Sequence, residues 1–370
     1  MVFSFFNPVK AGFGAGVSNR LSGVLRGLEA ECFLVVANKR AQSLSCVKDL
    51  KGRNGGEVFF FSGVEPNPSC ETVDRIAGVV RENNCDVVVA VGGGSVLDAA
   101  KLAAAMLKNE GSCRDFCEGS AKVLRKGSGF VAVPTTSGTG SEASPISVIT
   151  VKEQKRKVAV KSPLLFADFA LVDPELTFSM PPRLTATSGL DVVSHALEGL
   201  CSKNNSFLTD LLNLKSFDLA WNNLPLAVED GKNKKARENV MLASFLAGMC
   251  LGESGTANGH PISYCLTLEK GLEHGFACAL TLPFWLEYNW NFFDAAQKVA
   301  EIMKVSSARD ARKKLEEFII SAGGPSRLSL LGYSSEDLKR VAGCSFEKVS
   351  KRNVRNVSRE DFEGILRKAL

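Results

Sequence analysis

The chain has 370 residues and a net charge of +5; hydrophobic residues make up 45% of it and charged residues 23%. This composition excludes disordered and fibrous proteins, and the length exceeds what one hydrophobic core usually supports, so we expect two globular domains. The small, dispersed charge gives no support to nucleic-acid binding.

Targeting and membrane segments are not expected. Residues 1–10 lack the basic stretch followed by a long apolar stretch that a secretory signal needs. No apolar run approaches the length that spans a bilayer. The sequence therefore predicts a soluble, cytoplasmic protein with no membrane partner. Two basic runs, residues 152–161 and 232–237, are expected to be solvated faces or loops.

Eleven cysteines are scattered along the chain. In apolar stretches a thiol packs as a small hydrophobic group, and a reducing cytosol fits such cysteines best. The cysteines in apolar stretches are Cys85, Cys250, Cys265 and Cys278. Cys113 and Cys117 form the only close pair, and their spacing matches neither the usual zinc signature nor the usual redox signature. A structural role is expected for them.

In the first half of the chain, β-rich runs alternate with helical patterns. The expected strands cover residues 32–37, 57–61, 86–91 and 129–133, and the expected helices cover residues 14–25, 69–83 and 95–108. This alternation predicts an α/β domain with a parallel sheet and right-handed crossovers. Ligands of such sheets bind beyond the C-terminal ends of the strands.

After Pro181 and Pro182 long amphipathic segments replace the β-rich runs. The expected helices cover residues 185–201, 207–221, 236–251, 292–304 and 308–322. We therefore predict an α/β domain over residues 1–178 and an all-α domain over residues 179–370, with the junction near residues 173–183.

A triple-glycine turn follows the expected strand 86–91. Glycines have no Cβ atom to block a pyrophosphate, and the N-terminus of the following helix offers unpaired N–H groups and a favourable dipole. The residues of this turn are Gly92, Gly93, Gly94 and Ser95. The turn predicts a dinucleotide site; the alternative is a tight strand-to-helix turn without a ligand.

The segment 134–142, after the expected strand 129–133, is rich in hydroxyl groups. Hydroxyl groups and open backbone suit phosphate and ribose, although a Ser/Thr-rich turn that caps a helix has the same composition. The hydroxyl residues are Thr135, Thr136, Ser137, Thr139 and Ser141. Together with the glycine turn, this segment favours dinucleotide binding by the first domain.

The choice between NAD and NADP rests on the residues after the expected strand 32–37. An acidic side chain there binds the ribose hydroxyls of NAD and repels the extra phosphate of NADP. Here Asn38, Lys39 and Arg40 follow the strand, without a carboxylate. We expect NADPH in preference to NADH; a solvated loop is the alternative role of these cations.

All three histidines of the chain lie in its second half. Asp191 and His195 are four residues apart and share one face of a helix. A second helix can run from near His260 to a turn at Gly271, and a third can begin near His274. Three imidazoles and one carboxylate suit Fe(II) or Zn(II). A lone histidine is more often a packed core residue than a metal ligand. Here that alternative would have to hold for all three histidines, and it would not explain Asp191.

In this order the motifs resemble the iron-containing, or type III, alcohol dehydrogenases, and the likeness covers nearly the whole chain. The glycine turn with Asp98 and Lys101, the segment 134–142, the run that starts at Asp173 and the metal-ligand set all match. The resemblance implies a dehydroquinate synthase-like fold, with a dinucleotide-binding domain, an all-helical domain and a metal in the cleft between them. It also implies that Asp98 and Lys157 contact the cofactor.

The chain departs from the family at one position. Four residues after His260 many members have a further histidine that is proposed to relay protons, where this chain has Tyr264. The Tyr264 hydroxyl, or water and the cofactor ribose, could supply the proton. A packing role for Tyr264 is the alternative.

The residues around the metal ligands, 190–205 and 260–283, resemble the phosphonoacetaldehyde reductase branch of the family. That branch reduces phosphonoacetaldehyde to 2-hydroxyethylphosphonate, so the resemblance implies a small anionic or neutral aldehyde as substrate. Lys203 is expected to place a cation near the anionic end of this substrate; the alternative is an ordinary lysine at a helix end.

The expected activity is metal-dependent, NAD(P)H-linked reduction of a small aldehyde, in which the metal polarises the aldehyde oxygen and the cofactor delivers hydride. The alternatives are a general short-chain alcohol or polyol dehydrogenase, a dehydroquinate-synthase-like lyase and, outside enzymes, a silent nucleotide- or metal-binding protein. Fe(II) is the expected metal, with zinc as the alternative. A homodimer is expected because it is the commonest assembly.

Overall fold

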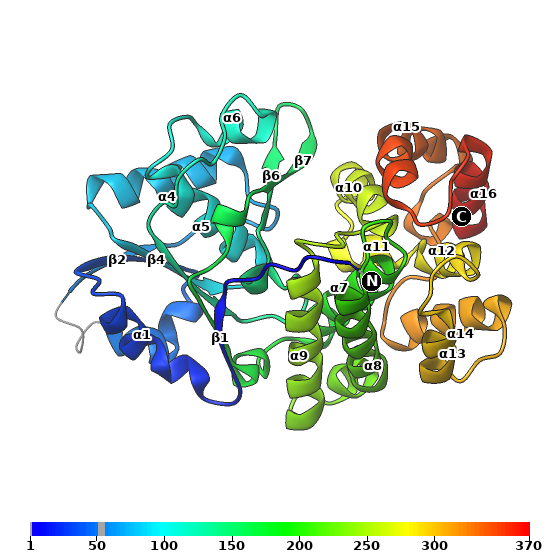
Figure 1. The fold of residues 1–370 in the computed structure, drawn as a ribbon, viewed down its shortest axis with the longest axis horizontal. Helices are drawn as coiled ribbons and strands as arrows, with labels where there is room; N and C mark the ends of the chain where they lie inside the picture. The colour runs from blue at the N-terminus through cyan, green and yellow to red at the C-terminus, as the bar shows by residue number, and fades with distance from the viewer. Residues whose placement is uncertain (1, 51–55) are drawn as a thin grey trace. The chain divides into compact units, whose positions relative to one another are not determined.

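The computed structural model of the chain describes residues 2–50 and 56–370. It divides into two compact units, each of which has its own cores (Figure 1). The N-terminal unit comprises Asn7–Thr136 and Gly140–Thr177. The C-terminal unit comprises Phe178–Leu370, together with residues 2–6 and Ser137–Thr139.

Six parallel strands form the main sheet of the N-terminal unit, in the order β1-β8-β5-β4-β2-β3. The strands are β1 (Lys10–Phe13), β2 (Cys32–Ala37), β3 (Glu57–Phe61), β4 (Val87–Gly92), β5 (Gly129–Pro134) and β8 (Phe169–Val172). The predicted parallel sheet is confirmed. The structure adds β1 and β8, which are only four residues long and therefore too short to show a periodic pattern.

Helices cover both faces of this sheet. They are α1 (Leu21–Gly27), α2 (Ser45–Lys48), α4 (Cys70–Glu82), α5 (Gly94–Met106) and α6 (Cys113–Glu118). Successive residues of a strand point to opposite faces, and in β2 Leu34 and Val36 pack with α4 and α5 while Phe33 and Val35 pack with α1 and α2. Burial on both faces explains why the central strands are almost wholly apolar.

The first expected helix begins later than predicted. A 3-10 turn over Val17–Arg20 precedes α1, whereas the sequence pattern predicts a helix over residues 14–25. Gly14 and Gly16 have φ angles of 135° and 75°, which a right-handed helix excludes. The glycines therefore form a turn, and the helix starts only after them.

A β-hairpin follows the hydroxyl-rich segment. Its strands, β6 (Ile146–Val151) and β7 (Arg156–Lys161), are antiparallel and form a separate two-stranded sheet. The basic residues of the run are exposed as expected, with one exception, Lys157. Lys157 is only 5% exposed, because it occupies an inward-facing position of this strand.

The C-terminal unit is entirely helical in its main segment, as predicted. Its helices are α7 (Pro182–Leu200), α8 (Phe207–Glu229), α9 (Lys234–Cys250), α10 (Gly259–Lys270), α11 (His274–Ala279), α12 (Leu282–Asn289), α13 (Ala296–Met303), α14 (Ala308–Ser321), α15 (Ser335–Arg352) and α16 (Arg359–Ala369). Figure 1 shows α7, α8 and α9 side by side. The expected helix 207–221 is longer in the structure, because α8 continues through Pro225 to Glu229.

Helix α7 is buried almost completely from Thr185 onward. It begins at Pro182, where the missing N–H of proline is harmless because the first turn has no acceptor for it. Gly189 and Gly199 leave no room for a Cβ atom, since side chains of α8 pack directly against them. Any polar side chain on the buried part of α7 is therefore carried into the core, where it needs a partner.

The second basic run contains a buried arginine, contrary to expectation. Arg237, 2% exposed, donates hydrogen bonds to Gly231 O, Met180 O and Thr185 Oγ1. Its guanidinium ties the start of α9 to the start of α7. The interpretation of residues 232–237 as a solvated run is therefore wrong at this position.

Cys265 is not the packing thiol that its apolar surroundings predict. It forms a disulfide with Cys344 and so joins α10 to α15. Cys85, Cys250 and Cys278 are buried thiols, in agreement with expectation. Sequence spacing cannot reveal the Cys265–Cys344 pair, since the two residues are 79 positions apart.

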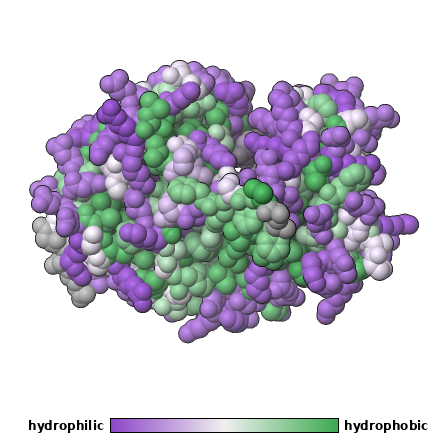
Figure 2. Space-filling model, viewed as in Figure 1, coloured by the Kyte–Doolittle hydropathy of each residue, from purple (hydrophilic) through white to green (hydrophobic). Residues whose placement is uncertain are grey.

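The exposed sides of α15 and α16 are mainly polar. On the face drawn in Figure 2, α15 and α16 present mainly hydrophilic residues, while the apolar side of each helix is buried. Such a pattern is typical of amphipathic helices that pack on one side only. Among the described residues, the structure contains no helix that is both long enough and apolar enough to cross a lipid bilayer.

Candidate active site

Two of the four predicted metal ligands lie on α7. Asp191 and His195 are one helical turn apart on this buried helix and are 2% and 6% exposed. Their spacing directs both side chains to the same side of α7. The structure therefore brings this pair together as the sequence predicts.

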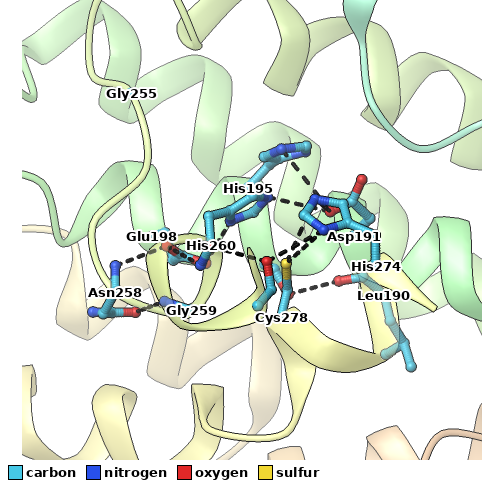
Figure 3. Close-up of polar contacts among 12 residues, drawn as sticks. Leu190, Asp191, His195, Glu198, Gly255, Asn258, Gly259, His260, His274 and Cys278 are labelled. Carbon is cyan, nitrogen blue, oxygen red and sulfur yellow. Dashed lines mark hydrogen bonds and ion pairs between the residues drawn. The ribbon is translucent and has the colours of Figure 1, made fainter. Parts of the chain in front are cut away.

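The other two ligands stand at the starts of two consecutive helices. His260 is in the first turn of α10, and His274 is the first residue of α11. Helix α10 ends at Gly271, whose φ of 67° is the left-handed conformation that commonly terminates a helix. This turn reverses the chain, so that both imidazoles face α7 (Figure 3).

The four side chains meet around Asp191. Its Oδ1 atom lies 3.2 Å from His260 Nε2, 3.7 Å from His274 Nε2 and 4.0 Å from His195 Nε2 (Figure 3). The rings of His195 and His260 stack with centroids 4.3 Å apart. Metal–ligand bonds of about 2.0–2.2 Å in a tetrahedral site place the ligand atoms about 3.3–3.6 Å apart. The separations of His260 and His274 from Asp191 are close to this range, and that of His195 is longer. The ligand atoms that all lie within 4.8 Å of one another are those of Asp191, His260, His274 and Cys278.

Neighbouring groups set the tautomers of two imidazoles. His260 Nδ1 lies 2.7 Å from the Glu198 carboxylate, which can only accept, so Nδ1 carries the proton and Nε2 is left as a lone pair. His274 Nδ1 lies 3.2 Å from Ser263 Oγ. Since Ser263 donates its single hydrogen to His260 O, His274 Nδ1 must be the donor here as well. In these tautomers both Nε2 atoms carry the lone pair that a metal ligand needs.

Unsatisfied buried atoms support the same conclusion. Among the described residues, Asp191 Oδ1 and His260 Nε2 are buried side-chain atoms without a hydrogen-bond partner. An unpaired polar atom in a protein interior costs free energy, and a native structure keeps one only where something satisfies it. A bound cation would satisfy both, so the residues present fit a metal.

The pKa values of Asp191 and His195 also suit metal binding. Burial alone would raise the pKa of Asp191, but the surrounding imidazoles outweigh it and hold this pKa below its usual range. Burial lowers the pKa of His195 to about 4. The site thus contains an ionised carboxylate and, at His195, a neutral imidazole, which are the protonation states that ligands need.

Glu198 is a site residue that the sequence analysis did not identify. Its carboxylate is fully buried and accepts hydrogen bonds from the N–H groups of Asn258 and His260, in addition to its contact with His260 Nδ1. A Cβ atom at Gly259 would approach Glu198 Oε1 to 2.7 Å, so glycine is required there. The available signal was its position three residues after His195, on the same face of α7.

Cys278 is a second site residue that the sequence analysis did not identify. Its Sγ atom lies 3.8 Å from His274 Nε2 and within 4.8 Å of the ligand atoms of Asp191, His260 and His274. The thiol packs as a small buried group, as expected, but it does so beside the metal ligands. Its position one turn after His274 on α11 was the signal in the sequence.

Tyr264 lies next to the metal ligands, whereas Lys203 bonds elsewhere. The Tyr264 and His274 rings are 6.1 Å apart, with an interplanar angle of 29°. Lys203 follows α7, and its ammonium donates to Ser350 O and Asn356 Oδ1. These two hydrogen bonds join Lys203 to the C-terminal part of the chain and not to the predicted metal ligands.

The glycine turn lies between β4 and α5 in the N-terminal unit. Gly92 ends β4, Gly93 precedes α5, and Gly94 and Ser95 open that helix. A Cβ atom at Gly92 would lie 2.7 Å from Val96, so only glycine allows the helix to start this close to the strand. The N-terminus of α5 then points its unpaired N–H groups beyond the strand end, as an anion site requires.

Asp98 and Lys101 fasten the hydroxyl-rich segment to α5. Asp98 accepts from Ser141 Oγ and from Val148 N. The ammonium of Lys101 donates to Ser141 Oγ and to the carbonyl oxygens of Ser141, Ser144 and Ile146. Burial lowers the pKa of Lys101 to about 8. Asp98, which is half-buried, and Lys101, which is buried, hold the backbone of residues 141–148 in place.

The predicted hydroxyl residues are divided between the two units. Thr135 and Thr136 belong with Ser141 to the N-terminal unit, and Thr135 N donates to Gly92 O beside the glycine turn. Ser137 and Thr139 belong to the C-terminal unit, where Ser137 Oγ donates to the sulfur of Met241. A contiguous sequence motif therefore contributes to both units.

Asn38 and Lys39 lie beside the glycine turn at the edge of the sheet. They follow β2, which is the direct neighbour of β4, and Ala37 pairs with Val91. Asn38 Oδ1 accepts from Ala41 N, and both side chains are exposed. The parallel register thus brings these two predicted cofactor residues to the same sheet edge as Gly92.

Two family models match consecutive parts of the chain. The model described as "Iron-containing alcohol dehydrogenase" matches residues 8–174. The model described as "Fe-containing alcohol dehydrogenase family, C-terminal" matches residues 185–370. Together they cover nearly all of both units.

Characterised relatives match over almost the full length. The chain is 32% identical to long-chain-alcohol dehydrogenase 1 of Geobacillus thermodenitrificans, over 90% of this chain and 88% of the relative. It is 29% identical to sulfoacetaldehyde reductase of Bilophila wadsworthia, over 99% and 98%. The crystal structure of sulfoacetaldehyde reductase from Bifidobacterium kashiwanohense in complex with NAD+ is 29% identical, with a TM-score of 0.92 over 100% of this chain and 99% of that one.

Proposed function

The chain belongs to the iron-containing alcohol dehydrogenase family and is an NAD(P)-linked alcohol dehydrogenase or aldehyde reductase; from this premise we propose that it reduces phosphonoacetaldehyde to 2-hydroxyethylphosphonate. The observation that carries the proposal is the meeting of three imidazole Nε2 atoms within 4.0 Å of the Asp191 carboxylate. Such a ligand set can hold a Lewis acid against the oxygen of a small aldehyde.

Two relatives support an anionic substrate. Both are named sulfoacetaldehyde reductases, one by sequence and one by structure. Sulfoacetaldehyde and phosphonoacetaldehyde are two-carbon aldehydes that end in a tetrahedral oxyanion, so a site for one has most of the features needed for the other. Sulfoacetaldehyde is therefore the second candidate substrate of this chain.

The chain's own residues prepare the reaction. A divalent ion bound by Asp191 and the three histidines supplies Lewis-acid polarisation of the aldehyde oxygen, and NAD(P)H supplies the hydride. Glu198 fixes His260 in the tautomer that presents Nε2, and Ser263 does the same for His274. The amides at the start of α5 bind the cofactor pyrophosphate.

We assign delivery of the final proton to Tyr264, at the position where many members of the family have a histidine. Its ring lies next to that of His274. Replacement Tyr264→Phe keeps the ring and removes the hydroxyl, so we expect kcat to fall about tenfold and its pH profile to change, which a packing role would not do. The control is Tyr288→Phe, which removes a hydroxyl that donates to Asn356 O. If Tyr264→Phe has the same kcat and pH profile as the wild type, the proton comes from water or from the cofactor ribose, and the role of Tyr264 is refuted.

The proposal also covers the metal, the cofactor, the assembly and the roles of the two units. We infer Fe(II) as the native metal, NADPH as the preferred cofactor because Asn38 and Lys39 replace an acidic residue, and a cytoplasmic homodimer as the working form. Residues Asn7–Thr136 and Gly140–Thr177 bind the dinucleotide, with Lys157 as a further cofactor contact. The helical unit binds metal and substrate.

The decisive experiment compares aldehydes. The purified protein is loaded anaerobically with Fe(II) or Zn(II), and loss of NADPH or NADH absorbance is followed with phosphonoacetaldehyde, sulfoacetaldehyde, propionaldehyde and lactaldehyde. We expect metal-dependent turnover with the highest kcat/KM for phosphonoacetaldehyde, and none in His260→Ala. A preference for sulfoacetaldehyde would select the second candidate, and turnover of only the uncharged aldehydes would refute both.

Lys203 provides a test of anion recognition. If its ammonium attracts the phosphonate, Lys203→Gln raises KM for phosphonoacetaldehyde and leaves KM for propionaldehyde unchanged. The matched control is Lys215→Gln, which removes an exposed ammonium that pairs with Asp218. An equal change of KM for both aldehydes would show that Lys203 acts through the fold, by its hydrogen bonds to Ser350 and Asn356.

A further inference from the structure

Three buried cysteines meet in the N-terminal unit, at a place that the proposed function does not use. The Sγ atoms of Cys70, Cys113 and Cys117 all lie within 4.8 Å of one another, and the three residues are 5%, 0% and 6% exposed. Cys70 is the first residue of α4, while Cys113 and Cys117 are one turn apart on α6. The sequence shows only the second pair, because Cys70 is brought in by the packing of α4 against α6.

The spacing of the sulfur atoms matches that of thiolates around a single ion. Metal–thiolate bonds of about 2.3 Å place the sulfur atoms of a trigonal or tetrahedral site about 3.8–4.0 Å apart. The distance from Cys70 Sγ to Cys117 Sγ is 3.9 Å. Ordinary packing of thiols does not require all three sulfur atoms to lie within 4.8 Å of one another, as they do here.

The start of α4 offers a favourable dipole to a thiolate. Cys70 stands in the first turn of this thirteen-residue helix, whose dipole stabilises negative charge. The Asp74 carboxylate accepts from the backbone N–H of Cys113, which holds the start of α6 against α4.

We propose that Cys70, Cys113 and Cys117 bind one thiophilic d10 cation, Cu(I) or Zn(II). Thiolate ligands select these ions over the hard cations. Binding forms three metal–sulfur bonds and releases the three thiol protons to solvent, with no change of oxidation state. The bound ion ties α4 to α6. This site is independent of the ligand set around Asp191.

The test measures thiolate ligation directly. Full-length reduced protein is first loaded with Fe(II), so that the site at Asp191 is filled, and is then titrated anaerobically with Cu(I) in one arm and with Cd(II), the spectroscopic stand-in for Zn(II), in the other. We expect one equivalent of thiolate-to-metal ultraviolet absorption in at least one arm, with a rise of Tm by several degrees at saturation. The arm that responds identifies the ion.

Substitutions locate the absorbing site. Cys113→Ser and Cys117→Ser abolish the absorption and the Tm rise, while Cys250→Ser, another buried cysteine, leaves both unchanged. Cys278→Ser excludes the thiol beside the other metal site as the source. Cys117→Ala replaces Cys117→Ser if the serine variant does not fold. The proposal is overturned if neither ion produces the absorption, or if the absorption survives Cys117→Ala.

Discussion

At the scale of single residues, the buried carboxylate of Glu198 fixes the orientation of the His260 imidazole. Glu198 has no exposure to solvent and contacts both the ring and the backbone of His260. Such a partner fixes the orientation of a metal-bound histidine and increases its basicity. It also satisfies N–H groups at the start of α10, which otherwise have no acceptor within the helix.

Removing the charge of Glu198 should weaken metal binding. In Glu198→Gln the amide keeps the shape of the side chain but no longer matches the donors around it, so we expect metal affinity to fall about 10- to 100-fold. Competition with a chelator measures the affinity. Glu142→Gln, a buried glutamate of the other unit, should leave it unchanged. Equal affinity in the wild type and Glu198→Gln would contradict this role.

At the scale of elements, the approach of α11 to α7 depends on a glycine. Gly275 follows the ligand His274, and a Cβ atom there would collide with the carbonyl oxygen of Thr187 on α7. Backbone cannot move aside as the end of a flexible side chain can. The position of His274 is therefore set by the absence of one methyl group.

The variant Gly275→Ala tests this dependence. We expect a loss of about 2–4 kcal/mol in the free energy of unfolding, from overpacking between two helices, together with weaker metal binding. Denaturant unfolding and metal titration measure the two effects. Gly343→Ala, inside α15 with open space around the new methyl group, should be neutral or stabilising by up to about 1 kcal/mol. A Gly275→Ala protein as stable as the wild type would refute the argument.

The start of α4 is held by a carboxylate four residues upstream. Glu65 accepts from the N–H and hydroxyl of Ser69 and from the hydroxyl of Thr72. Burial alone would raise the pKa of Glu65, but these hydrogen bonds outweigh it and lower the pKa from 4.5 to about 2. Because the folded-state pKa is depressed, this stabilisation is present above pH 4.5 and is lost as the pH falls toward 2.

Replacement of Glu65 should remove this pH dependence. Glu65→Gln is expected to lose about 1–2 kcal/mol at neutral pH, a value reduced for the partial exposure of the side chain, and to differ less from the wild type as the pH falls from 4.5 toward 2. Urea unfolding at several pH values measures the difference. Glu82→Gln, at the other end of α4, controls for the lost charge. A constant difference over this pH range would exclude the proposed linkage.

At the scale of the whole molecule, the metal ligands belong to one unit only. All four stand on α7, α10 and α11, which share the C-terminal unit, whereas the sheet and the glycine turn belong to the N-terminal unit. Each unit has hydrophobic cores of its own. A ligand that binds one folded unit stabilises that unit by mass action.

Removal of the metal should therefore destabilise the C-terminal unit more than the N-terminal unit. We expect chelation to lower the Tm of the C-terminal unit by about 5–10 °C, corresponding to about 2–3 kcal/mol of binding free energy. Hydrogen exchange should show lost protection in α7, α10 and α11 and unchanged protection in β2 and β4. Uniform loss of protection in both units would show that the metal stabilises the chain as a whole. Cofactor is omitted from both samples.

The sequence by itself determined the class of fold and pointed to the four residues that we propose as metal ligands. Alternating β-rich and helical patterns predicted the parallel sheet, because the period of hydrophobic residues depends only on local backbone geometry. The four ligands could be predicted because the chain has only three histidines, and because Asp191 and His195 are one helical turn apart. A turn at Gly271 was predictable from the conformational freedom of glycine.

Only the tertiary structure decided which distant side chains meet. Glu198 reaches His260, Cys265 pairs with Cys344, and Cys70 joins Cys113. The local sequence does not tell which distant residue each of them meets. The burial of Lys157 and Arg237 was missed for the same reason. The composition of a basic run predicts an exposed segment, but it does not show which single side chains point into the core. Contacts between residues far apart in sequence depend on how elements pack, and hydrophobic periodicity carries no information about that.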